Sequence, residues 1–351
     1  MTQDSQQAQR IVGGVDTHGE THHAAVVDKV GRQLADRQFP TTPQGYRHLL
    51  TWLRSFGDLD RVGVEGTGAY GAALARLLHQ AGVLVVEVDR PDRKTRRMKG
   101  KSDPVDAYAA ALAALSGRAT GTPKSRDGRI EAIRALRVAR RSAVKARTQA
   151  INQLRALLTT GPAELREQLR TLPTGALITT CARLRPTADL ADPVQATKAA
   201  LRRLARRHQQ LSAEISELDS DLAPLVTAAA PELVAQPGVG IDVAGQLLVT
   251  AGDNPQRLKS EAAFAHLCGA APIPASSGRT NRHRLNRGGD RWANRALHTV
   301  ALCRLRWDPD TRAYVTRRRQ QGLSNKEIMR CLKRFIARQI YHALPRPRVA
   351  S

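Results

Sequence analysis

The sequence predicts an α/β domain at the N-terminus, followed by a long and mainly α-helical region. Three observations support this prediction. The first 116 residues alternate between short runs typical of strands and segments with helical spacing. From about residue 117 onward, apolar residues recur every three or four positions over long stretches. The chain has 351 residues, of which 41% are hydrophobic, so it can bury a core in more than one domain.

The first 116 residues contain five expected strands and three expected helices. The strands alternate in hydrophobicity or are rich in β-branched residues, and Pro40 ends the third one. The expected strands span residues 11–16, 23–28, 34–39, 61–65 and 83–88, and the expected helices span 44–55, 70–81 and 104–116. The resulting order, β-β-β-α-β-α-β-α, is that of the ribonuclease H-like fold.

The middle of the chain predicts a coiled-coil connector. From Leu201 to Leu222 the apolar positions follow steps of three and four residues over three heptads, and Pro224 is expected to end the helix. An earlier helix, over residues 129–158, has a weaker apolar seam. The two helices can pack as an antiparallel hairpin within one chain or against another protomer, and the sequence does not choose between these arrangements.

The last part of the chain predicts a mainly α-helical domain with a helix-hairpin-helix-like motif. A helix ending near Gln236 is followed by a Pro237–Gly240 turn and a second apolar helix. Glycines at such a turn allow backbone N–H groups to approach a phosphate, although glycine-rich turns between helices also occur without a ligand. The predicted domains are therefore residues 1–116, 117–232 and 233–351.

The charge distribution predicts a nucleic-acid partner. The chain has 56 Lys and Arg residues against 31 Asp and Glu residues, a net charge of +25. The basic excess lies in residues 90–101, 117–160 and 278–351, as expected for a binding footprint, although a solvated charged face is the alternative. Aromatic residues make up only 3%, which argues against an aromatic base-stacking platform. The expected contacts in the first segment are Arg93, Lys94, Arg96, Arg97 and Lys99.

The cysteines and the hydropathy pattern predict a protein of the reducing cytoplasm without a membrane partner. The four cysteines are far apart and form no C-x-x-C pair, so neither a zinc site nor a disulfide framework is expected. No apolar run approaches 18 residues, and the first ten residues are polar.

Four carboxylates predict a metal-dependent active site. Asp16 and Glu65 end two strands, and Asp103 and Asp106 lie three residues apart on one face of the last helix of the α/β domain. Such a set of oxygen ligands can hold two Mg²⁺ or Mn²⁺ ions for phosphodiester chemistry. The alternative is structural: Asp103 as an N-cap before Pro104, with Asp106 at N3, and Asp16 as an ordinary turn acid.

These residues resemble a family of bacterial insertion-sequence transposases that also includes the Piv DNA invertase. The first shared motif is the Asp-Glu-Asp-Asp set formed by the four acids. The second consists of Gln236-Pro237-Gly238-Val239-Gly240, Gly252-Asp253, Cys268-Gly269 through Pro272, Ser276-Ser277-Gly278, Arg287-Gly288-Gly289-Asp290 and Asn294-Arg295-Ala296-Leu297. The match spans nearly the whole chain in order. Arg287-Gly288-Gly289-Asp290 departs from the Lys-x-Gly-Asn pattern that is more usual in the family.

The resemblance implies a RuvC-like nuclease domain, a coiled-coil connector and a C-terminal domain with a catalytic serine. It assigns the nucleophile to Ser277, with Ser276 as the neighbouring alternative. It also implies a homo-oligomer, a dimer or tetramer, that recombines donor and target double-stranded DNA under the guidance of a structured non-coding RNA. The basic residues expected to balance the negative charge that develops near the serine are Arg279, Arg282, Arg284 and Arg287. The neighbouring His283 either helps to activate the serine or contacts an RNA or DNA phosphate.

Two other function classes remain open at this point. A structure-specific nuclease resembling a Holliday-junction resolvase would use the four acids and water, without the serine. An architectural nucleic-acid-binding protein would bind in a salt-sensitive manner and break no strands. Substitution of Ser277 separates the recombinase from the first alternative, and substitution of the acids separates it from the second.

Overall fold

The computed structural model describes residues 9–88, 102–279 and 283–345. Contacts divide the chain into two compact units, each assembled from separate stretches of sequence. Unit 1 consists of Met1–Glu131, Thr250–Gly288 and Leu344–Ser351, and unit 2 consists of Ala132–Val249 and Gly289–Ala343. The predicted division into residues 1–116, 117–232 and 233–351 concerns consecutive segments and remains a prediction.

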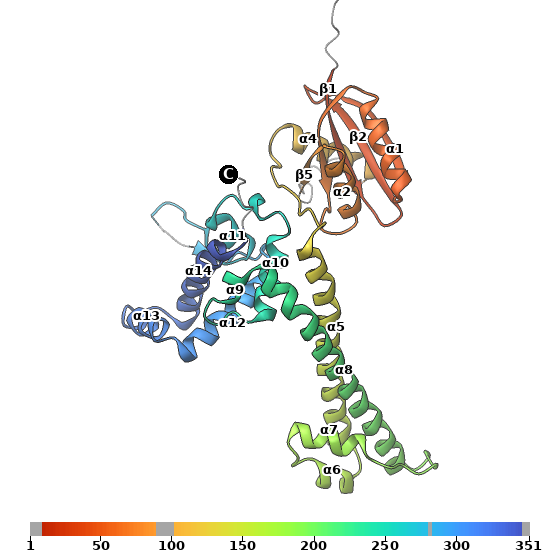
Figure 1. Cartoon of the computed structure of the whole chain (residues 1–351), viewed down its shortest axis with the longest axis vertical. Helices are drawn as coiled ribbons and strands as arrows, with labels where there is room; N and C mark the ends of the chain where they lie inside the picture. The colour runs from red at the N-terminus through yellow and green to blue at the C-terminus, as the bar shows by residue number, and fades with distance from the viewer. Residues whose placement is uncertain (1–8, 89–101, 280–282, 346–351) are drawn as a thin grey trace, which may run out of the picture. The chain divides into compact units, whose positions relative to one another are not determined.

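Unit 1 is built on a five-stranded sheet in the order β3-β2-β1-β4-β5 (Figure 1). The strands are β1 (Arg10–Thr17), β2 (Thr21–Asp28), β3 (Gln33–Pro40), β4 (Asp58–Glu65) and β5 (Leu84–Val88). The first three form an antiparallel meander, while β4 runs parallel to β1 and β5 runs parallel to β4. The helices are α1 (Pro43–Arg54), α2 (Ala72–Gln80) and α4 (Asp103–Leu115). The predicted element order of the α/β domain is confirmed.

Side-chain alternation along the strands separates the two faces of this sheet. One face packs Val15 and Val62 into a core with Leu49 of α1 and Leu74 of α2. The other face is covered by α4, which approaches the sheet closely because two strand positions have no side chain. A Cβ added at Gly14 would lie 2.2 Å from the Ala107 carbonyl oxygen, and one at Gly63 would lie 2.5 Å from that of Ala110. The glycines therefore fix α4 across β1 and β4.

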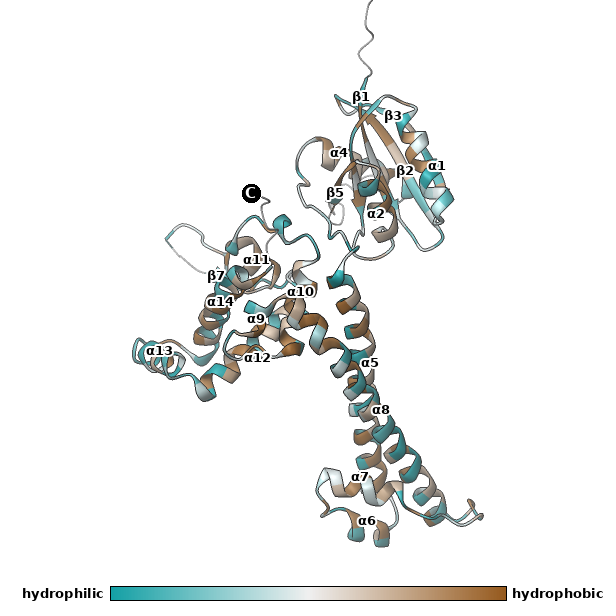
Figure 2. Ribbon diagram, viewed as in Figure 1, coloured by the Kyte–Doolittle hydropathy of each residue, from teal (hydrophilic) through white to brown (hydrophobic). Residues whose placement is uncertain are grey.

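In unit 2 two long helices pack along each other (Figure 1). They are α5 (Arg129–Thr160), of which unit 2 contains all but the first three residues, and α8 (Pro193–Ala229). Leu154 and Leu158 of α5 share a buried cluster with Leu201 and Ala205 of α8. The short helices α6 (Ala163–Leu169) and α7 (Thr174–Ala182) add further apolar side chains to this cluster. Both long helices carry hydrophobic and hydrophilic residues in alternation along their length, as amphipathic helices do (Figure 2).

The expected end of the second long helix at Pro224 is wrong, because α8 continues to Ala229. Proline removes one helical hydrogen bond and usually ends or kinks a helix. Leu222 and Val226, however, are both buried, so packing on either side of Pro224 holds the helix in place. Of the predicted seam, Leu201, Ile215 and Leu222 are buried, and the other four positions are half-buried. The coiled coil itself remains a prediction.

The remaining helices of unit 2 include the two on either side of the predicted glycine turn, α9 (Pro231–Val234) and α10 (Ile241–Ala251). The others are α12 (Arg291–Trp307), α13 (Pro309–Gln320) and α14 (Asn325–Ala343). Gly238 adopts a φ of +77°, a conformation that favours glycine. The buried Arg304 of α12 donates hydrogen bonds to the Pro237 carbonyl at 2.9 Å and to Gln339 at 2.6 Å. The contacts with α12 explain the conformation of this turn. That the turn binds a phosphate remains a prediction.

Residues 250–288 form the second part of unit 1. They contain a 3₁₀ turn η1 (Pro255–Arg257), helix α11 (Glu261–Leu267) and a short hairpin of β6 (Ile273–Pro274) and β7 (His283–Arg284). Asp253 accepts hydrogen bonds from the backbone N–H groups of Ile130 and Glu131, at 2.7 and 3.1 Å. Asn254 donates to the Pro123 carbonyl at 2.9 Å. These bonds tie the segment to residues 123–131.

Among the described residues, no helix is both long and apolar enough to span a membrane. The four cysteines are free thiols, and burial raises the pKa of Cys181 to about 11. Cys181 and Cys268 are buried side chains of the apolar core.

Candidate active site

Two of the four predicted acids lie next to each other at one edge of the sheet. β1 and β4 are parallel neighbours in which Val15 pairs with Val64, so Asp16 and Glu65 occupy successive positions at the same level. Alternation places Asp16 on the same face as Gly14, and Glu65 on the same face as Gly63. Because α4 covers both glycines, the two carboxylates lie on the α4 side of the sheet.

The other two acids come from the first turn of α4. Asp103 is its first residue and Asp106 lies one turn later, as the spacing of three predicted. Asp106 is 2% exposed, whereas the side chain of Asp103 is 45% exposed. The N-cap is Ser102, which makes no side-chain capping bond, so the alternative interpretation of Asp103 as an N-cap is wrong. The helix begins one residue earlier than expected, which moves Asp103 inside it.

His18 brings Asp16 and Asp103 together. Its Nε2 atom lies 3.0 Å from Asp16 Oδ2 and 3.4 Å from Asp103 Oδ1. One possible ligand atom from each of these residues lies within 4.8 Å of the other two. His18 is not among the site residues that the sequence motifs predicted. The available signal was its position two residues after Asp16, since side chains at i and i+2 of an extended segment share a face.

Glu65 and Asp106 line one cavity of about 780 Å³ within unit 1. Glu87 of β5 also lines it, as do Arg118 and, from α11, His266. The Thr67 hydroxyl donates a hydrogen bond to Glu87, and the Glu87 backbone N–H donates to the Gly121 carbonyl at 2.7 Å. Glu87 is a further acidic group that the sequence analysis missed, because it lies inside an otherwise apolar strand.

The site has the ligand chemistry of a divalent cation centre. Carboxylate oxygens are the groups that Mg²⁺, Mn²⁺ and Ca²⁺ prefer, and an imidazole nitrogen also suits Mn²⁺ and Zn²⁺. The spacing within the Asp16–His18–Asp103 cluster allows all three side chains to reach one ion. Like charges gathered in this way repel each other unless a cation lies between them. The acidic cluster therefore fits a divalent metal ion, whose identity the site leaves open.

The predicted nucleophile lies on the β6–β7 hairpin of unit 1. Ser276 and Ser277 are exposed, and Gly278 beyond them has a φ of +54° with open space around it. Asn286, after the hairpin, donates a hydrogen bond to the His266 carbonyl at 2.8 Å and so attaches this segment to α11. Within the described residues, no hydrogen bond joins Ser277 to one of the four acids.

The predicted basic contacts divide into two sets. Arg279, Arg284 and Arg287 are exposed on the hairpin or just after it, beside the exposed His283. The others lie outside the described residues, namely Arg93, Lys94, Arg96, Arg97, Lys99 and Arg282.

Comparison with known proteins gives two family matches. Residues 13–161 match a DEDD-type domain of the IS110 group that is described as a transposase, and this range contains all four acids. Residues 231–316 match a domain described as the transposase IS116/IS110/IS902 family, and this range contains Ser277.

Relatives with similar sequences come from bacterial insertion elements. The mini-circle protein of Streptomyces coelicolor that is named as a transposase for IS117 is 27% identical over 94% of this chain and 93% of its own length. The 43.6 kDa protein of insertion element IS110, from the same organism, is 37% identical over 30% of this chain and 26% of its own length. The 42 kDa protein of IS900 from Mycobacterium paratuberculosis is 29% identical over 38% of this chain and 34% of its own length.

Proposed function

Because the chain belongs to the IS110/IS116/IS902 family of transposases and is a DNA-recombining enzyme, we propose that it cuts and rejoins DNA through a phosphoserine intermediate. The observation that carries this proposal is the convergence of the predicted acids at the edge of the sheet. A structural role alone does not explain why Asp16 and Asp103 gather around His18 while Glu65 and Asp106 line one cavity.

The four acids, with His18, are the groups that would hold Mg²⁺ or Mn²⁺. When bound, such ions polarise a phosphodiester and favour loss of a proton from an attacking hydroxyl. The buried carboxylates of Asp16 and Asp106 are placed by a strand and a helix rather than by loops. Rigid placement of this kind keeps ligand geometry constant during a reaction.

Ser277 supplies the hydroxyl in this mechanism. Its Oγ forms a bond to phosphorus, the bond from phosphorus to the 3′ oxygen of the DNA breaks, and the proton lost from Oγ balances the one gained by the 3′-hydroxyl. Attack of a different 3′-hydroxyl on the phosphoserine reverses the step and joins a new strand end without ATP. Arg279, Arg284 and Arg287 balance the negative charge that develops at the phosphate.

The partners of the reaction are donor and target double-stranded DNA, a structured guide RNA and further copies of the chain. The support for a polyanionic partner is the net charge of +25.

The support for the coiled-coil connector is the packing of α5 on α8, and the support for the helix-hairpin-helix-like motif is the turn between α9 and α10. RNA guidance is tested by measuring whether the chain binds RNA transcribed from the DNA beside its own reading frame more tightly than an unrelated RNA of equal length.

A covalent-adduct assay tests the proposed reaction. DNA that carries the ends of the element and is labelled at its 3′ ends is incubated with the chain and Mg²⁺, denatured, and separated by electrophoresis. We expect label attached to protein with the wild type and with Ser276→Ala, and no attached label with Ser277→Ala. Strand cutting that persists in Ser277→Ala would establish the hydrolytic nuclease instead. If the wild-type chain binds this DNA but neither cuts it nor becomes labelled in Mg²⁺, and combined substitution of the four acids leaves the binding unchanged, the chain would be a non-catalytic binder.

A further inference from the structure

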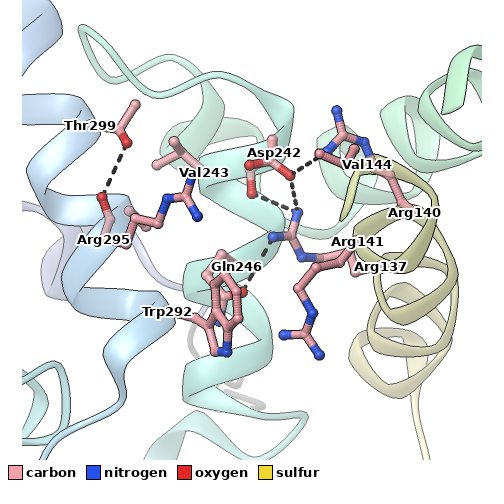
Figure 3. Close-up of a pocket in the computed structure, with 11 residues that line it drawn as sticks. Arg137, Arg140, Arg141, Val144, Asp242, Val243, Gln246, Trp292, Arg295 and Thr299 are labelled. Carbon is pink, nitrogen blue, oxygen red and sulfur yellow. Dashed lines mark hydrogen bonds and ion pairs between the residues drawn. The ribbon is translucent and has the colours of Figure 1, made fainter. Parts of the chain in front are cut away.

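Unit 2 contains a basic pocket that the proposed chemistry does not use. Helices α5, α10 and α12 enclose a volume of about 190 Å³ (Figure 3). Four arginines, one aspartate and an indole dominate its lining: Arg137, Arg140, Arg141, Arg295, Asp242 and Trp292. All of these residues belong to unit 2.

Two of the four arginines have their charge balanced within the chain. Arg137 donates hydrogen bonds to the Asp242 carboxylate at 2.9 Å and to its carbonyl oxygen at 2.7 Å. Arg140 donates to Asp219 at 2.5 and 3.1 Å, and to the Asp242 carboxylate at 3.1 Å. The two guanidinium groups and two carboxylates form a compensated network that fixes α5 against α8 and α10. Arg137 and Arg140 therefore have a structural role in the lining of the pocket, and their charge is already balanced.

The other two arginines stand beside an exposed aromatic ring instead. The Arg141 and Arg295 guanidinium carbons lie 4.5 and 5.9 Å from the centre of the Trp292 ring. No ion pair links either group to a carboxylate in the part of the chain that the structure describes. Trp292 is 44% exposed. The pocket thus presents two uncompensated positive charges beside one indole.

This composition suits one unpaired nucleotide. Guanidinium groups bind phosphate oxygens through paired hydrogen bonds, and an indole provides a flat face on which a base stacks. A base inside a duplex has its faces covered by neighbouring pairs, so an indole recognises bases that have left the stack. The low aromatic content of the chain does not oppose this role, because a single ring among arginines is sufficient.

A wider groove continues from the pocket along α5. It has a volume of about 1090 Å³ and shares Arg141, Trp292 and Arg295 with the pocket. Its polar lining on α5 changes from basic to neutral: Lys145, Thr148, Gln149, Asn152 and Gln153. From Arg141 to Asn152 the helix rises by about 16 Å, which exceeds the length of one nucleotide. Amide side chains of this kind form hydrogen bonds with base edges.

We propose that Arg141, Trp292 and Arg295 hold an unpaired nucleotide of a single-stranded segment whose neighbouring bases lie along α5. This proposal rests on the proposed function only in requiring a nucleic-acid partner. The site takes a single strand, and RNA and DNA are the two sources that an experiment separates.

Fluorescence polarisation with the full-length chain in EDTA tests the proposal without any strand cutting. The probes are a labelled single-stranded RNA, a single-stranded DNA of the same sequence, and the corresponding duplex DNA. We expect Trp292→Ala to weaken binding of a single strand about tenfold, whereas duplex binding changes little. Trp292→Phe retains most of the affinity because it keeps an aromatic face. Arg141→Gln and Arg295→Gln each reduce the salt dependence of binding by about one charge.

The chain offers matched controls on the same helix. Trp307 is 77% exposed and Arg306 is also exposed, and neither lines the groove. Trp307→Ala and Arg306→Gln should leave single-strand binding unchanged. Equal losses in Trp292→Ala and Trp307→Ala would overturn the proposal, as would equal losses for the single strand and the duplex. A change from oligomer to monomer in Trp292→Ala would assign this face to contacts between copies of the chain instead.

The same assay separates this proposal from the proposed function. Ser277→Ala should bind single strands like the wild type, because the serine is not part of the groove. If Ser277→Ala forms no adduct but the groove variants bind normally, only the groove proposal fails. If no probe binds the wild-type chain, the nucleic-acid partner itself is wrong and both proposals fail.

Discussion

The acidic site of unit 1 and the arginine pocket of unit 2 show two ways of gathering like charges. In unit 2, Asp219 and Asp242 balance Arg137 and Arg140, and the other two arginines of the pocket, Arg141 and Arg295, are exposed. In unit 1, the carboxylates of Asp16 and Asp103 share one imidazole. Charge that is balanced inside the chain stabilises the fold, whereas charge that is not balanced requires a ligand of opposite sign. We therefore expect the acidic site of unit 1 to bind a cation and the arginine pocket of unit 2 to bind a polyanion.

The largest expected effect comes from the buried acids of unit 1. Asp16→Asn and Asp106→Asn should each lower the rate of DNA strand cleavage by about 100-fold or more, because loss of a metal ligand removes several kcal/mol of transition-state stabilisation. The measurement is cleavage of DNA carrying the element ends in Mg²⁺. Arg306→Gln serves as the control. Cleavage by both Asn variants at the wild-type rate would show that the acidic site is structural.

A second effect of similar size concerns which protomer supplies the serine. Asp16→Asn chains and Ser277→Ala chains should each be inactive alone. If the acids of one protomer act with the serine of another, mixing the two variants restores covalent adducts, since some sites receive both intact groups. The adduct assay measures this recovery. No recovery in the mixture would count against a shared site.

His18 should tune the metal preference of unit 1 more than its total activity. His18→Ala is expected to weaken Mn²⁺ binding about tenfold, because an imidazole nitrogen contributes more to Mn²⁺ than to Mg²⁺. Isothermal titration with each ion measures the difference. His266→Ala is a matched control, since His266 lines the neighbouring cavity but is not part of the Asp16–His18–Asp103 cluster. Equal loss of affinity for both ions in His18→Ala would mean that the imidazole only positions the carboxylates.

The smallest expected effect separates the balanced arginines from the exposed ones. Asp242→Asn removes the carboxylate shared by Arg137 and Arg140, and should destabilise unit 2 by about 1 kcal/mol after allowance for its partial exposure. The melting temperature should fall by about 2–4 °C. Arg141→Gln, whose guanidinium has no carboxylate partner in the described residues, should leave the melting temperature unchanged. If Asp242→Asn and Arg141→Gln lowered the melting temperature equally, Arg141 would be as important for stability as the charge-balanced Arg137 and Arg140, and the two kinds of arginine would not differ.

The sequence predicted the elements of the N-terminal α/β part of unit 1 well because local patterns determine them. Strand alternation gave the five strands, and the spacing of three between Asp103 and Asp106 placed both on α4. Once two parallel neighbours are assigned, register alone brings Asp16 level with Glu65. The strand and helix order therefore depends on local patterns, whereas the meeting of the acids depends on the pairing of β1 with β4 and on the packing of α4 against both strands.

Other features depend on contacts that no local pattern contains. The hydrogen bond from Arg140 to Asp219 spans 79 residues, and that from Arg137 to Asp242 spans 105. The sequence of α5 alone therefore does not show which of its arginines are balanced by carboxylates of α8 and α10. The ring of Trp292 meets Arg141 only in the folded unit. Pro224 is a stop signal by itself, yet tertiary packing overrides it in α8.

Binding of Mn²⁺ measured by electron paramagnetic resonance tests the central claim most directly, since it requires neither DNA nor turnover. The free Mn²⁺ signal should decrease when the wild-type chain is added, and the decrease should be lost in the Asp16→Asn/Asp106→Asn double variant. Trp292→Ala should bind the ion like the wild type. Unchanged Mn²⁺ affinity in the double variant would contradict the assignment of the acids as a metal centre, and with it the proposed chemistry.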